Sequence, residues 1–101
     1  MDDTTVVTDI SKALADPTRL KIVRLLSETA HPLCVNAITQ KLSVSQSAVS
    51  QHLRVLRQAG LAEGNRYGYH VHYVLNRAAL NRYREAIGEL VAEAEEPAHP
   101  S

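Results

Sequence analysis

The stretch VNAITQKLSVSQSAVSQHLRVLRQA, residues 35–59, decides the fold. Its first part has apolar residues at the spacing of a short helix: Val35, Ile38 and Leu42. A three-residue turn is predicted at Ser43–Ser45, because Ser45 can cap a helix that follows it. This next helix is expected over about 46–59, since Gly60 suits the left-handed position after a helix end. Two short helices joined by a tight turn predict a helix-turn-helix.

The second helix of this pair has one apolar and one polar face. The apolar face holds Val49, Leu53 and Leu56. The polar face is a hydrogen-bonding stripe: Ser47, Ser50, Gln51 and Arg54. Such a stripe predicts sequence-specific DNA binding, because Gln and Arg pair bidentately with adenine and guanine and Ser adapts to either.

Three residues beside the stripe extend this predicted contact. Ser45 and Gln46 stand at the helix N-terminus, where backbone amides favour a phosphate. His52 lies beside the stripe, where it either touches the DNA backbone or is a partly packed surface histidine.

After Leu61 the apolar spacing changes from helical to alternating. One face of the predicted strand holds Tyr69, Val71, Tyr73 and Leu75, and the other holds His70, His72 and Val74. The preceding turn residues are Gly64, Asn65 and Gly68. We therefore expect a two-stranded β-hairpin over 61–75, with Arg66 near its tip, in the position of a wing.

Three further helices are predicted around this unit, over 4–15, 17–28 and 77–95. Asp16 before Pro17 and Asn76 before the last helix are strong starting signals. The first and last helices carry apolar stripes: Val7 and Ile10, then Leu80, Tyr83, Ile87, Leu90 and Val91. A small chain has little surface to cover both stripes, so we expect a two-fold partner to bury them. The tail at 97–101 is expected to be loose.

The composition agrees with one small, mainly helical domain over 1–101. The chain has 101 residues, of which 45% are hydrophobic and 22% charged, so a two-domain enzyme is excluded. With no Phe and no Trp, the core must use smaller apolar residues, which favours packed helices with a small sheet. No apolar run exceeds three residues, so we expect neither a membrane span nor a signal peptide, and a cytoplasmic protein.

The net charge of zero hides an uneven distribution. Residues 41–84 carry seven basic residues and one acidic one, whereas residues 85–101 carry five Glu. A basic segment that contains both the stripe and the wing strengthens the prediction of DNA binding.

An enzyme is not predicted. The chain has no phosphate-binding glycine loop, no zinc-protease helix motif and no carboxylate pair spaced for acid and base roles. Cys34 is the one cysteine, and His31 is the only histidine close to it in the sequence.

Two stretches together resemble the ArsR/SmtB family of bacterial winged-helix repressors. They are ALADPTRLKIVRLLSE at 13–28 and LCVNAITQKLSVSQSAVSQHLRVLRQAGLAEGNRYGYHVHYVL at 33–75. The resemblance implies a homodimer, built on the first and last helices, that represses an operator until a metal ion or other effector releases it. The DNA-contacting residues that it implies are Ser45, Gln46, Ser47, Ser50, Gln51, His52 and Arg54, with Arg66 in the wing.

The chain departs from the family where the family binds its effectors. Members that sense soft metals have two cysteines one residue apart, but here Asn36 follows Cys34 at that distance. Members that sense zinc-like metals use Asp and His on the last helix, but residues 77–95 contain neither. Members that sense sulfur species use two cysteines in one chain, whereas this chain has one cysteine and cannot close a bridge within itself.

No cofactor is therefore predicted, although a metal ion stays possible with an incomplete ligand set. The candidate ligands are the His70 and His72 pair and Cys34. The plainer interpretations are a polar strand face and a small buried thiol. The effector could be an organic ligand, a redox signal, a metal or none.

The sequence thus predicts a winged helix-turn-helix of five helices and a two-stranded wing. It would act as a homodimeric repressor on a pseudo-palindromic operator. The alternative is a winged-helix dimer that holds a protein partner and never meets DNA. Salt distinguishes the two, because phosphate contacts make binding fall steeply with salt concentration.

Overall fold

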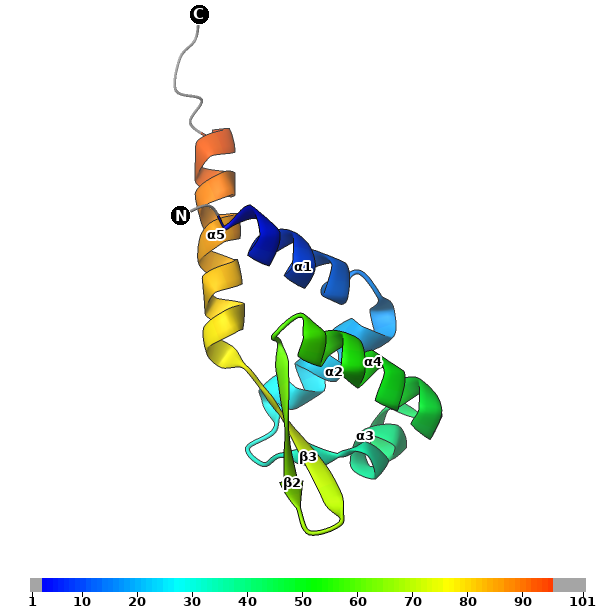
Figure 1. The fold of residues 1–101 in the computed structure, drawn as a ribbon. Coiled ribbons are helices and arrows are strands. Elements are labelled where there is room, and N and C mark those ends of the chain that lie inside the picture. Colours follow the sequence, from blue (N-terminus) through cyan, green and yellow to red (C-terminus); the bar gives the residue numbers. More distant parts are fainter. Residues whose placement is uncertain (1–2, 96–101) are drawn as a thin grey trace, which may run out of the picture.

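The structure is a computed structural model that describes residues 3–95, so the tail predicted at 97–101 lies outside the described residues. Five helices and three short strands follow one another along the chain (Figure 1). They are α1 (Thr4–Leu14), α2 (Pro17–Glu28), β1 (Leu33–Cys34), α3 (Val35–Leu42), α4 (Gln46–Gln58), β2 (Ala62–Tyr67), β3 (His70–Leu75) and α5 (Arg77–Glu95). The five predicted helices are confirmed, each within a residue or so of its expected ends.

Three of the helices begin at the side-chain caps that the sequence predicts. Oδ2 of Asp16 accepts the backbone N–H of Arg19 at 3.0 Å. Oγ of Ser45 accepts the N–H of Ala48 at 3.2 Å, and Oδ1 of Asn76 accepts that of Ala79 at 3.1 Å. Each contact satisfies one of the backbone donors that a helix start leaves without a partner, which explains why the helices begin here.

The sheet has three antiparallel strands in the order β1-β3-β2. Its β2–β3 hairpin is the predicted two-stranded wing, and β1 is a third strand that the sequence did not predict. Leu33 lies opposite Tyr73, and Cys34 lies opposite His72. Strand β1 was missed because two residues are too few to show an alternating pattern.

The turn of the hairpin also differs from the prediction. It is formed by Gly68, whose φ is 64°, and Tyr69, while Gly64 and Asn65 lie inside β2. A Cβ at Gly64 would meet Tyr73 Cε1 and Val71 Cγ1 at 3.0 Å, so this glycine makes room for packing rather than for a turn. Tyr69 belongs to the turn and is 98% exposed, so it does not share the inner strand face of Tyr73.

One apolar core is shared by helices α1, α2, α3 and α4, the sheet and the start of α5. Five of its side chains are fully enclosed: Ile22, Ile38, Val49, Leu56 and Leu61. Ile10 is only 1% exposed in this core, which removes it from the predicted dimer-contact residues. Its side chain is used within the protomer and is closed to a second copy.

No helix among residues 3–95 has the length and apolar character needed to cross a membrane.

Candidate nucleic-acid interface

Helix α4 is held by one face and exposed on the other. Val49, Leu53 and Leu56 are at most 1% exposed and fix the helix to the core. The opposite side is open to solvent and carries the predicted stripe: Ser47, Ser50, Gln51 and Arg54. A polar face on a rigidly packed helix can enter a DNA major groove without rearrangement of the protein.

The turn before α4 sets its direction relative to α3. Ser43 has a φ of 54°, and its backbone N–H donates to the carbonyl of Thr39 at 2.9 Å, so α3 ends in a left-handed residue. Ser45 then caps α4, and Ser45 and Gln46 are both exposed at its N-terminus. The exposed start of α4 presents free backbone amides together with two polar side chains.

His52 behaves differently from its neighbours on α4. Its side chain is 23% exposed, and its Nδ1 lies 3.3 Å from Nη1 of Arg19 and 3.9 Å from Oδ2 of Asp16. The histidine therefore packs partly against α2, and its exposed part means that this packing does not exclude the predicted DNA contact. Sequence reasoning did not find Arg19 and Asp16 as its partners, although both belong to the family-like stretch at 13–28.

Asp16 is the centre of a small polar group at the start of α2. Its hydrogen bond from the backbone N–H of Arg19 lowers the pKa of the carboxyl below its usual value. Partial burial opposes this effect, and the electrostatic interactions with His52 and Arg19 act in the same direction as the hydrogen bond. Asp16 is therefore a permanent anion at neutral pH.

The wing carries Arg66 on its exposed strand β2, opposite Val71 and next to the pair Tyr67–His70 that closes the hairpin. The hairpin of β2 and β3 projects away from α5 and past the helices (Figure 1). Arg66 thus lies near the tip, as predicted.

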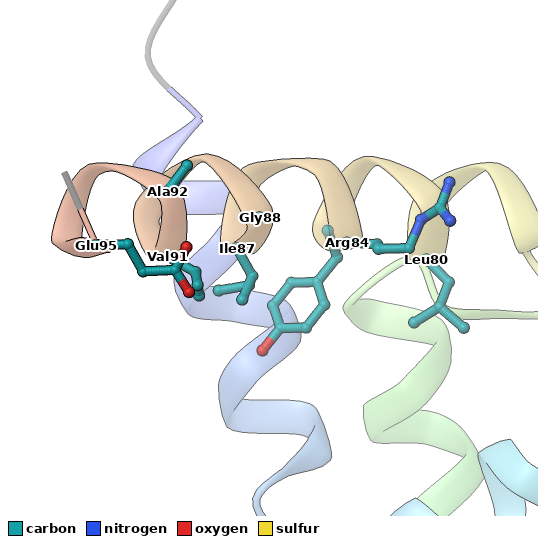
Figure 2. A pocket seen from close by; sticks show the side chains of 8 residues that line it. Leu80, Arg84, Ile87, Gly88, Val91, Ala92 and Glu95 are labelled. Atoms are coloured by element: carbon teal, nitrogen blue, oxygen red, sulfur yellow. The ribbon is translucent and has the colours of Figure 1, made fainter.

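The predicted dimer contacts on α5 are more exposed toward its C-terminal end. Leu80, Tyr83 and Ile87 are half-buried, whereas Leu90 is 61% and Val91 48% exposed. Figure 2 shows Leu80, Ile87 and Val91 on the same side of the helix, where they line a shallow apolar hollow.

The first helix borders the same region. Val7 is half-buried on α1, and Oγ of Ser11 on α1 lies 2.9 Å from Oη of Tyr83, so a hydrogen bond joins α1 to α5. Together the two helices offer an apolar surface that no other part of residues 3–95 covers.

The candidate metal ligands are only partly brought together. Cys34 and His72 are cross-strand neighbours, a relation that sequence reasoning missed because it missed β1. The ring of His72 contacts that of Tyr67 with a centroid distance of 5.2 Å, while His70 is exposed. Among residues 3–95 no three His, Cys, Asp or Glu side chains gather as a metal site needs. The described residues therefore fit neither the paired-cysteine pattern nor the Asp and His pattern by which members of the ArsR/SmtB family bind metals.

The comparisons with known proteins agree with this arrangement. The sequence profile described as "Bacterial regulatory protein, arsR family" matches residues 16–63. A transcriptional repressor SmtB homolog from Synechocystis sp. is 36% identical over 91 residues, which are 89% of this chain and 67% of that protein. The chain belongs to the ArsR family of bacterial regulatory proteins.

Two other known proteins bear on repression and on the fold. The arsenical resistance operon repressor of Escherichia coli is 48% identical over 65 residues, 64% of this chain and 55% of that protein. A homodimeric winged helix-turn-helix DNA-binding domain from Mycobacterium bovis superposes with a TM-score of 0.71 at 25% identity, covering 100% of this chain and 94% of that one. The winged helix-turn-helix fold of this ArsR-family chain is thereby confirmed.

Proposed function

We propose that this ArsR-family protein is a homodimeric repressor that binds a pseudo-palindromic operator through α4 and is released by an effector. The observation that carries the proposal is the exposed polar face of α4 on a helix whose other face is enclosed in the core. A surface of this kind can read base edges only if the helix is held in a fixed direction, and the buried face holds it.

The contacts divide by chemistry into base and backbone contacts. Gln51 and Arg54 read base edges, and Ser47 and Ser50 adapt to the bases beside them. Ser45 and Gln46 contact a phosphate at the start of α4, and His52 contacts one beside the stripe. Arg66 contacts the backbone from the wing.

The charge distribution supports this orientation. The acidic residues of α5 lie between its middle and its C-terminal end: Glu85, Glu89, Glu93 and Glu95. That end of α5 lies far from the hairpin tip in Figure 1. The negative charge is thus kept away from the surface that approaches DNA, which favours steering by the basic segment.

A second copy would cover the apolar surface of α1 and α5. The residues that we propose for this contact are Val7, Leu80, Tyr83, Ile87, Leu90 and Val91. In a two-fold dimer the same surface is used twice, and the two copies of α4 face two half-sites.

The experiment that tests the proposal is a selection of bound duplexes from random DNA by the whole chain, followed by a salt titration. We expect an enriched sequence with two inverted half-sites and an affinity that falls steeply with salt. A chain that enriches no sequence, or one whose binding is insensitive to salt, would instead favour the protein-interaction alternative.

A further inference from the structure

Arg19, in the first turn of α2, joins three parts of the protein. Its Nε donates to the carbonyl of Ala13 at the end of α1, at 2.7 Å. Its Nη1 lies 3.3 Å from Nδ1 of His52 on α4, and its own backbone N–H is held by Asp16. The guanidinium is thus anchored by α1 and faces the imidazole of the proposed recognition helix.

The chemistry of this contact determines which ring nitrogen of His52 carries the proton. A guanidinium has only donors and stays charged, so Nδ1 must accept and the neutral ring must carry its hydrogen on Nε2. Nε2 has no hydrogen-bond partner within residues 3–95. Oγ1 of Thr39 is the one buried side-chain polar atom without a partner in that part of the chain. Nε2 of His52 also lacks a partner but is not buried in this sense, so it reaches solvent.

Asp16 favours the opposite arrangement. Its Oδ2 lies 3.9 Å from the same Nδ1 and can only accept, so without Arg19 it would attract the ring proton to Nδ1. Nε2 would then offer a lone pair to solvent. A DNA phosphate also only accepts hydrogen bonds, so it binds an Nε2–H and is repelled by a bare Nε2.

We propose that Arg19 is a positioning residue for DNA binding, which keeps the Nε2–H of His52 available to a phosphate by donating to Nδ1. The inference rests on the proposed function, because it assigns a role to one of the proposed contacts. Arg19 acts through His52 and does not itself touch DNA.

The first test uses the free protein and needs no DNA. Nitrogen-15 NMR spectra of the imidazoles, recorded where the histidines are neutral, distinguish the two ring tautomers. We expect Nε2–H for His52 in the wild type and a shift toward Nδ1–H in Arg19→Met, which keeps the apolar stem and loses the donors. Arg24→Ala, which removes the same charge from an exposed position of α2, should keep the wild-type spectrum. A wild-type His52 with its proton on Nδ1, or an unchanged tautomer in Arg19→Met, would overturn the proposal.

The second test is a double-mutant cycle on the selected operator. Arg19→Met and His52→Ala should each weaken binding about five- to tenfold, the size of one hydrogen bond. The double variant should bind no more weakly than His52→Ala alone, because Arg19 has nothing left to position. Additive losses would overturn the proposal. If the wild type bound no DNA, the proposed function would fail, while the NMR spectra would still decide the tautomer.

Discussion

Cys34 on β1 lies directly opposite His72 on β3, so the one thiol of the chain and an imidazole stand side by side on the sheet. Side chains at directly opposed positions have Cβ atoms about 5 Å apart, close enough to share a ligand. A tight metal site needs three or four donors, however, and no third one joins this pair within residues 3–95.

We therefore expect the purified protein to carry no stoichiometric metal and Cys34→Ser to retain operator binding. The measurement is operator affinity with and without zinc, nickel, copper(I) and arsenite, on the wild type, Cys34→Ser and a His70→Ala/His72→Ala double variant. A metal-driven loss of about tenfold in the wild type that Cys34→Ser abolishes would make Cys34 a sensing ligand.

Gly64→Ala is expected to destabilise the wing. The added methyl group would stand 3.0 Å from the Tyr73 ring and from a Val71 methyl group, both on the inner face of the sheet. We expect the free energy of unfolding to fall by about 1–3 kcal/mol, the usual cost of overpacking. Urea unfolding at one protein concentration measures it, with Asn65→Ala at the exposed neighbouring position as the control. Equal stability of the two variants would show that β2 moves freely to make room.

The sequence was sufficient for the helices because their signals are local. The caps Asp16, Ser45 and Asn76 lie next to the elements that they begin, and the apolar spacing of α4 is visible within a single helix. The errors concern contacts between distant segments. Strand β1 forms only because β3 lies beside it, and the burial of Ile10 depends on how α1 packs in the core.

The site was predictable to the same degree. Exposure of the α4 stripe follows from the apolar face opposite to it, so its residues could be named from spacing. The bond between His52 and Arg19 joins residues 33 positions apart, and no local pattern indicates it.

Ile87→Glu should separate the proposed dimer. The change puts a charge among half-buried and exposed apolar side chains of α5, where a second copy would have to bury it without a partner. We expect monomers by light scattering and a loss of operator binding, although α4 is untouched. Ala78→Glu adds the same charge at an exposed position of α5 and should stay dimeric. An Ile87→Glu dimer with normal DNA affinity would assign α5 another role.

Asp16 should make stability depend on pH in the acid range. Its folded-state pKa is lowered from 3.8, so its carboxylate stabilises the fold above that value and the contribution is lost as the pH falls through the folded pKa. Asp16→Asn keeps a capping side chain without the charge, so it should be less stable than the wild type at neutral pH and equal to it in strong acid. Urea unfolding across this range measures the difference, with Asp9→Asn on α1 as reference. A difference that does not vary with pH would contradict the assignment.

Whether α4 reads DNA is tested by the operator affinity of Gln51→Ala and Arg54→Ala in a gel-shift titration. Each should cost about 1–3 kcal/mol on the selected operator and relax preference at particular base pairs. Arg66→Ala should weaken binding to all sequences alike and reduce the salt slope by about one unit. Lys21→Ala serves as the control, because it removes a positive charge from an exposed position of α2. Unchanged operator affinity in both α4 variants would contradict the claim.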